Sequence, residues 1–282
     1  MKELDFDIFE ILNQRICQGN YTLPSIPEAS LRLMNLLSDS DTSLEELEKT
    51  VGMDPILASQ ILKIANSCIS GAIVEVTSLK NALMRLGRKH IRSIVMMLSI
   101  KASIIKSKTF LGPMKQIWSH SISSAFLKRY VAKKFKEEPE ESFTVGLLHN
   151  MGKLILLSLL NEMLQESAQE ISEDFLGQIY IAHHLEITKK LLSAWKISPK
   201  IIQIIALQDS DIESIKNSPL SESDQKMVFS LILISFICKS IEENLIKEKF
   251  QQFSSLLSID IAYLEDILKQ KEKIAEEILP FI

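Results

Sequence analysis

Residues 141–160 read ESFTVGLLHNMGKLILLSLL, and this stretch sets both the fold and the functional question. It places His149 and Asn150 inside a run of apolar residues, which predicts a buried helical segment. Gly146 and Gly152 flank the polar pair and would let neighbouring helices approach closely. Because imidazole nitrogens bind transition metals, the first question is whether this strip is a metal centre.

The composition of the chain predicts an all-α fold. Gly and Pro number eight each among 282 residues and aromatic residues make up 6%. Such a mixture favours helices and offers few turn residues for a sheet. The sequence predicts two helix starts: one at Ser43, with Glu46 three residues later, and one at Asp54, which is followed by Pro55.

Cysteine usage and hydropathy indicate a cytoplasmic location and no membrane association. Cys17, Cys68 and Cys238 are odd in number and far apart, which predicts neither disulfides nor a cysteine metal site. Residues 1–16 lack the basic start and apolar run of a signal peptide. The apolar run 227–238 is too short to span a bilayer.

The charge of the chain is unevenly distributed. Residues 76–136 contain 14 of the 32 Lys and Arg residues and none of the 36 Asp and Glu residues. This segment therefore either contacts acidic parts of the same chain or binds a nucleotide, nucleic acid or other anionic ligand. The candidate anion-binding patch within it, beside Gly87, is called the basic junction and comprises Arg85, Arg88, Lys89 and Arg92. A solvated basic turn is the alternative interpretation.

The chemistry of residues 54–66 argues against DNA binding through a helix-turn-helix. Two short helices are predicted around Gly52, but the would-be recognition helix DPILASQILKIAN, residues 54–66, has one Lys and no Arg. Apolar residues stand where side chains that read base edges would be needed. The sequence favours packing helices here.

Several segments together resemble the HDOD family, helical output domains related to HD-type phosphohydrolases. The first are LPSIPEASLRLMNLL at 23–37, LEELEKTVGMDPILASQILKIANS at 44–67 and SLKNALMRLG at 78–87, and GLLHNMGKLIL at 146–156 continues the likeness. The resemblance covers roughly residues 16–212. It implies an HDOD-like helical fold of two subdomains. We place these at residues 1–111 and 112–215, followed by C-terminal helices at 216–282 that pack on the body or on a partner.

The resemblance also implies where an HD-type metal centre would lie. His120 matches the first histidine ligand and His149 the second, while Asn150 stands where the family commonly has Asp. An amide offers a neutral oxygen and cannot supply the anionic charge that a catalytic divalent cation requires.

The later ligand positions depart from the family in the same way. A His-His pair expected about a dozen residues after Trp195 is replaced by Gln208-Asp209, and the segment 227–240 contains no acid, only Ser230, Ser235 and Ser240. The family often has a histidine at the place of His184. His183 and His184, predicted at a helix start, would point about 100° apart and could not easily share an ion.

These observations predict a protein that signals without catalysis. We expect a non-enzymatic bacterial output or scaffold module, acting in stress, motility or second-messenger regulation, that binds a protein partner or a small regulatory ligand. Its HD centre would be vestigial (His120, His149, Asn150, His184, Gln208 and Asp209) and would need no cofactor, although weak divalent metal binding at His120 and His149 stays open. The alternatives are a metal-dependent phosphohydrolase acting on a nucleotide, a nucleotide or nucleic-acid binder using 76–136, and a homo-oligomer joined through the C-terminal helices.

Overall fold

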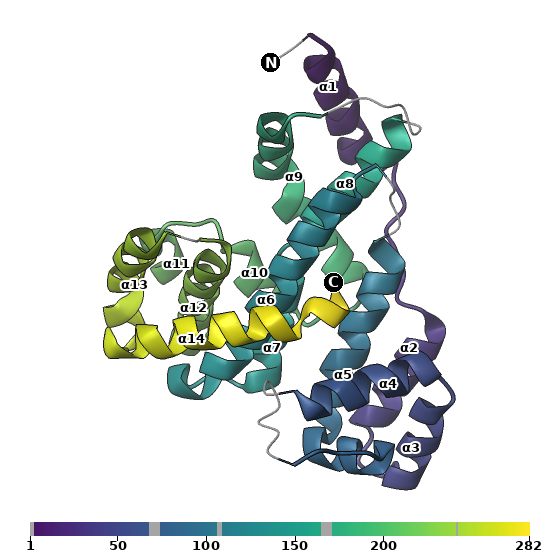
Figure 1. The fold of residues 1–282 in the computed structure, drawn as a ribbon. Coiled ribbons are helices and arrows are strands. Elements are labelled where there is room, and N and C mark those ends of the chain that lie inside the picture. The colour runs from purple at the N-terminus through teal and green to yellow at the C-terminus, as the bar shows by residue number, and fades with distance from the viewer. Residues whose placement is uncertain (1–2, 68–73, 106–108, 165–170, 241) are drawn as a thin grey trace.

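A computed structural model describes residues 3–67, 74–105, 109–164, 171–240 and 242–282. Within these ranges every regular element is a helix and there is no strand, so the all-α prediction is confirmed (Figure 1). The helices are α1 (Glu3–Cys17), α2 (Glu28–Ser38), α3 (Leu44–Gly52), α4 (Pro55–Asn66), α5 (Leu79–Ile104), α6 (Leu111–Phe135), α7 (Pro139–Leu148), α8 (Met151–Leu164), α9 (Glu173–Ala194), α10 (Pro199–Ala206), α11 (Ile212–Lys216), α12 (Glu222–Lys239), α13 (Glu243–Leu257), α14 (Ala262–Glu277) and the 3-10 turn η2 (Leu279–Phe281).

Both predicted helix starts are confirmed. The Ser43 hydroxyl accepts a hydrogen bond from the Glu46 N–H at 3.1 Å, which caps α3. One carboxylate oxygen of Asp54 accepts from the first two free N–H groups of α4, and Pro55 occupies the first helical position. Side-chain oxygens thus satisfy N–H groups that a helix start otherwise leaves unpaired.

Gly87 bends α5 without ending it. Its backbone has φ +72° and ψ 159°, a conformation that residues with a Cβ rarely adopt. Helical structure resumes directly after it, so the two helices predicted around Gly87 form one bent element.

Two groups of helices meet where α5 contacts α7 and α8. Helices α2, α3 and α4 pack on α5, while α6 contacts α7, α8, α12 and α14 in the second group. Figure 1 shows α2–α5 gathered at one end of the molecule and α8–α14 around the rest. Helix α1 lies apart from α2–α4, near α8 and α9. It is held there by a Phe9–His183 ring contact at 5.8 Å between centroids and by Arg15, whose guanidinium is 3.8 Å from Glu162.

The two glycines of the opening strip allow close helix packing, as predicted. A Cβ on Gly146 would lie 2.7 Å from the Ser124 carbonyl oxygen of α6. On Gly152 it would lie 2.0 Å from the His184 carbonyl oxygen of α9. Any side chain at either position would push a helix away. These two contacts fix the short connection between α7 and α8, which carries His149 and Asn150, against its neighbours.

The predicted start of the helix that carries His183 and His184 is wrong. Helix α9 begins at Glu173, ten residues earlier, where the Ser172 hydroxyl accepts from the Phe175 N–H at 3.2 Å. Ser172 is followed by two acidic residues, which favour a helix start through the helix dipole. The two histidines therefore lie mid-helix.

The described residues contain one helical stretch apolar and long enough to span a membrane, Pro139–Leu164. Of its most apolar 18-residue window, 83% is buried inside the protein, and the stretch comprises α7 and α8 around the turn at His149. That burial is what a core helix shows. Cys17 and Cys238 are free thiols, and Cys68 lies outside the described residues.

The C-terminal helices lie on the body of the protein. Helix α13 packs on α12, and α14 packs on α6. The Trp118 indole of α6 donates to the Phe281 carbonyl at 3.0 Å, and the Tyr130 hydroxyl donates to Asp266 at 2.9 Å. The end of the described chain thereby covers one side of α6.

Candidate functional site

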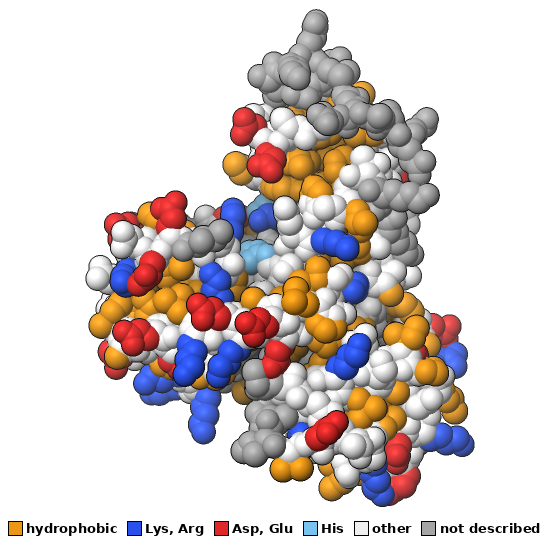
Figure 2. Space-filling model, in the orientation of Figure 1, with side chains coloured by type: hydrophobic (Ala, Val, Ile, Leu, Met, Phe, Trp, Pro, Cys, Tyr) orange, Lys and Arg blue, Asp and Glu red, His pale blue; other side chains and the backbone are white. Residues whose placement is uncertain are grey.

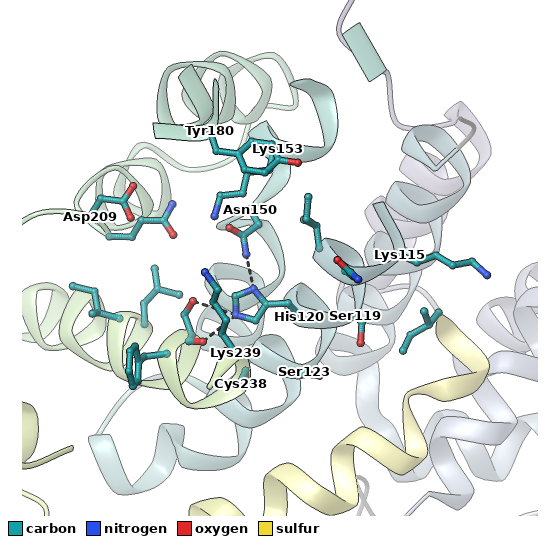
Figure 3. A pocket seen from close by; sticks show the side chains of 18 of the residues that line it. Lys115, Ser119, His120, Ser123, Asn150, Lys153, Tyr180, Asp209, Cys238 and Lys239 are labelled. Carbon is teal, nitrogen blue, oxygen red and sulfur yellow. Dashed lines mark hydrogen bonds between the residues drawn. The ribbon is translucent and has the colours of Figure 1, made fainter. Parts of the chain in front are cut away.

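Four residues from different elements form what we call the histidine centre: His120 of α6, His149 and Asn150 between α7 and α8, and Ser235 of α12. The two imidazole rings are nearly perpendicular, at 85°, with centroids 5.2 Å apart. His149 and Asn150 are buried, and His120 faces a cavity (Figure 3). The structure therefore brings together the first three residues of the predicted vestigial site.

Hydrogen bonds to two carbonyl oxygens define which ring nitrogens carry protons. His149 Nδ1 lies 2.7 Å from the Gly146 carbonyl oxygen, and His120 Nε2 lies 3.0 Å from the Ser235 carbonyl oxygen. A carbonyl only accepts, so both of these nitrogens donate. The remaining nitrogens, Nε2 of His149 and Nδ1 of His120, keep free lone pairs.

Asn150 satisfies both lone pairs at once. Its amide nitrogen is 3.0 Å from His120 Nδ1 and 2.6 Å from His149 Nε2. The two N–H bonds of the amide each point to one imidazole, whereas the reversed amide would set its oxygen against two lone pairs. The amide nitrogen thus occupies the position between two imidazoles that a cation would take.

Burial keeps the two histidines uncharged. It lowers the pKa of His120 to about 4, and the positive charges of Lys153 and Lys239 act in the same direction. The pKa of the fully enclosed His149 falls well below its ordinary value for the same reason, with His120 adding to the effect. At neutral pH the histidine centre is a neutral hydrogen-bonded group.

The residues present do not fit the divalent metal of an HD-type centre. Both imidazole lone pairs are taken by Asn150, and α12 offers Ser235, whose hydroxyl lies 3.3 Å from each histidine Nε2, in place of an acid. In the described part of the chain no three His, Cys, Asp or Glu side chains are grouped to hold a metal ion. A site without an anionic ligand binds hard cations weakly.

The other predicted site residues lie close by but serve different contacts. Gln208 donates from its amide to the His149 carbonyl at 2.8 Å. Asp209 lies 2.7 Å from His184 Nε2, and this hydrogen bond lowers the pKa of the Asp209 carboxyl. His183 turns instead toward the Phe9 ring. Adjacent imidazoles on α9 therefore face different partners, as their helical spacing predicts.

A cavity of about 830 Å³ opens in front of the histidine centre. His120 and Asn150 line it together with Lys153 of α8, Tyr180 of α9 and Lys239 of α12. Figure 2 shows histidine surface in a hollow bordered by Lys or Arg side chains, between the C-terminal helices and the α8–α9 region. The sequence analysis missed these lysines. The available signal was Lys153, a charged residue in the otherwise apolar strip GLLHNMGKLIL.

The basic junction is largely occupied by contacts within the chain. Arg85 donates to the Ala65 carbonyl at 3.1 Å, and Arg88 donates to the backbone carbonyls of Asp39 and Thr42. Lys89 pairs with Glu138 at 3.3 Å. These bonds support the interpretation in which the basic segment contacts other parts of the same chain.

The fold and the site together define a class: an all-helical protein in which two histidines and an amide from different elements form one buried polar centre. The family follows from a direct match. The chain belongs to the HDOD family, because a family model of the HDOD domain matches residues 23–210.

Solved structures share the fold over nearly the whole chain. A candidate metal-dependent phosphohydrolase from Shewanella amazonensis superposes with a TM-score of 0.76 at 18% identity, covering 97% of this chain and 98% of that one. An HDOD domain protein of unknown function from Geobacter sulfurreducens gives 0.66 at 20%, covering 95% and 98%. A candidate signal transduction protein from Marinobacter aquaeolei gives 0.63 at 18%, covering 98% and 64%. At these identities the likeness shows the fold alone.

Among curated proteins, an uncharacterized protein of Treponema pallidum is 23% identical over 191 residues. The match covers 65% of this chain but 37% of that protein, so the chain spans well under half the length of this relative.

Proposed function

We propose that this protein is a non-enzymatic signalling module, an output or scaffold domain that works by binding a protein partner or a small regulatory ligand in the bacterial cytoplasm. The observation that carries the proposal is the position of Asn150, whose amide donates to both imidazoles of the histidine centre. A metal would have to displace that amide and would gain two neutral ligands without an anion.

The comparisons supply the context for signalling. The chain belongs to the HDOD family, and one protein of the same fold is a candidate signal transduction protein. Another is a candidate metal-dependent phosphohydrolase, which supports the competing proposal of an enzyme. The two proposals differ in what they require of the histidine centre, since only the enzyme needs a cation there.

Metal content and turnover decide between them. The purified chain is incubated with Mn²⁺ or Fe²⁺, desalted, and analysed for bound metal, and phosphate release from nucleoside mono-, di- and triphosphates is then measured. We expect less than stoichiometric metal and no release above buffer. Stoichiometric metal that disappears in His149→Ala, together with turnover, would overturn the proposal.

His183→Ala is the matched control for that experiment. His183 is a histidine of α9 that contacts Phe9 and takes no part in the histidine centre. Metal lost equally from His183→Ala and His149→Ala would report non-specific binding rather than an active centre. The oligomeric state of the wild type at micromolar concentration, measured by light scattering, tests the homodimer alternative in the same preparation.

A further inference from the structure

We propose that the cavity in front of the histidine centre binds a small phosphate-bearing molecule with an apolar or aromatic portion, held by Lys153, Lys239 and Lys249. The inference rests on the proposed function, because it treats the histidine centre as one wall of a binding site and not as a catalyst. The cavity draws these three lysines from α8, α12 and α13.

The charges lining the cavity favour an anion. Four lysines contribute to it and Asp209 is the one acidic residue among its lining residues. Asp209 is hydrogen-bonded to His184. Within the described ranges, neither Lys153, Lys239 nor Lys249 has a carboxylate within 4.0 Å. Unpaired ammonium groups that share one cavity repel each other, and a multiply charged anion relieves that repulsion.

The close view shows which lysines can reach a ligand. In Figure 3 the ammonium ends of Lys153 and Lys239 lie beside Asn150 and His120, whereas Lys115 extends away from them. Lys153 is partly buried, and burial lowers its pKa; the Asp209 carboxylate acts against this shift, and the charge of Lys239 adds to it. Because Asp209 is also hydrogen-bonded to His184, an anion bound between the two lysines would add charge compensation that Asp209 supplies only in part.

The remaining walls suit the rest of the ligand. Ile232 and Phe236 of α12 and Tyr180 of α9 line the cavity opposite or beside the lysines. The Lys249 ammonium lies 5.9 Å from the centroid of the Phe236 ring and 5.1 Å from that of Phe253, so aromatic faces hold it at the edge of the cavity. A volume of about 830 Å³ is in the range of small-molecule sites, and mixed apolar and polar walls are typical of them.

The contrast with the basic junction strengthens the assignment. In the basic junction, Arg85 and Arg88 donate hydrogen bonds to backbone carbonyls, and Lys89 pairs with Glu138. At the cavity, Lys153 and Lys249 contact aromatic rings, but neither they nor Lys239 form an ion pair with a carboxylate among the described residues. The anionic ligand expected from the charge pattern is therefore assigned to residues that lie mostly outside 76–136.

Calorimetric titration with three probes tests the proposal. ATP, inorganic pyrophosphate and adenosine are titrated into the full chain in low-salt buffer containing EDTA. We expect ATP to bind saturably, pyrophosphate to bind more weakly and adenosine not to bind. Lys153→Gln and Lys239→Gln should each weaken ATP binding about tenfold, since a charge-assisted hydrogen bond is lost. Lys239→Arg, which keeps the charge, should retain most of the affinity.

Lys63→Gln is the control, because it makes the same charge change on an exposed residue of α4 away from the cavity. Absence of saturable ATP and pyrophosphate binding to the wild type, or an equal loss in Lys63→Gln, overturns the cavity assignment. Chromatography of the recovered ATP, repeated with Mn²⁺ present, separates the two proposals. Recovery of intact ATP supports the non-enzymatic proposal, whether or not ATP binds in the cavity. Hydrolysis that His149→Ala abolishes contradicts the non-enzymatic proposal but not the proposed binding site.

Discussion

Helices α6 and α12 both contribute to two buried polar centres, of which one is uncharged and the other is charged. One is the neutral histidine centre. The other is a charged group in which Lys128 of α6 lies 2.7 Å from the Glu137 carboxylate, with both side chains almost fully enclosed. Ser142 donates to the same carboxylate at 2.6 Å, and Ser230 of α12 contacts both Lys128 and Glu137.

The difference shows where a ligand can act. In the charged centre every charge has a partner inside the protein, so the group holds helices together and offers nothing to a ligand. The histidine centre is also satisfied, but it borders a cavity whose lysines are not paired. Function is therefore expected beside the neutral centre and stability from the charged one.

The largest effect is expected from breaking the charged centre. Lys128→Ala leaves the Glu137 carboxylate buried without its counter-ion, which should lower the free energy of unfolding by about 3–5 kcal/mol in urea denaturation. Lys226→Ala on the same helix α12 as Ser230 removes an exposed i,i+4 pair and should change the free energy little. Equal losses in the free energy of unfolding in Lys128→Ala and Lys226→Ala would contradict the expectation that the buried pair stabilises the fold more than the exposed one.

The contribution of the neutral centre to the free energy of unfolding should depend on pH, which distinguishes it from the charged centre. Because the pKa of His120 falls to about 4 in the folded protein, the unfolded chain binds more protons below its ordinary value of 6.5. The contribution of His120 to stability is then complete above about pH 6.5 and decreases as the pH falls toward 4, by about 1.4 kcal/mol for each pH unit. His120→Asn should reduce the slope of stability against pH by this amount in urea denaturation series, while His149, whose pKa is also lowered, keeps its own contribution. Ser230→Ala, in the charged centre, should leave the slope unchanged.

Asn150→Asp converts the neutral centre into a charged one. A carboxylate cannot donate to the two imidazole lone pairs, so we expect a loss of about 1–3 kcal/mol at pH 8. The loss should shrink near pH 5.5, where one imidazole takes up a proton beside the new carboxylate. We expect no phosphate release from this variant with Mn²⁺, because Ser235 still stands in place of the acid expected from α12. Metal-dependent turnover in Asn150→Asp would show that a single residue separates this protein from an enzyme.

The smallest effect is expected from Ser235→Ala, judged against Ser230→Ala in the same helix α12. Ser230→Ala removes a hydroxyl that contacts two charged groups, and should cost about 1.5–3 kcal/mol. Ser235→Ala removes a hydroxyl 3.3 Å from both histidines but keeps the carbonyl that accepts from His120, and should cost at most about 1 kcal/mol. Thermal unfolding of the two variants gives the order directly, and a reversed order would contradict the assignment of charge to one centre.

Local signals in the sequence predicted much of the fold. Ser43 and Asp54 cap helices because the rules for helix starts involve residues three positions apart. The close contacts at Gly146 and Gly152 were likewise predictable, since only a missing side chain permits them. The start of α9 was missed because its first residue, Glu173, lies ten residues before His183, and the search centred on the histidines.

The chemistry of the site was less predictable because it depends on orientation between helices. The sequence places His120, His149 and Asn150 in one centre, but the two-way donation by Asn150 requires knowing which ring nitrogens face carbonyls. Ser235 was one of three serines in the acid-free segment 227–240, and its orientation toward two histidines is set by how α12 packs. Lys153, Lys239 and Lys249 come from three helices, so no spacing in the sequence predicts that they share a cavity.

The placement of α1 has a consequence for how the molecule is divided. Leu12 and Ile16 of α1 are fully buried, and this helix contacts α8 and α9 through Arg15 and Phe9. Helices α2–α5 are thus inserted in the chain between α1 and the helices on which α1 packs. Dividing the chain at residue 111 would separate α1 from the helices that it covers. In a fragment that begins after residue 111, the apolar surface of α8 and α9 that α1 covers would be exposed to solvent. Such a fragment would aggregate through this surface even if it folded correctly.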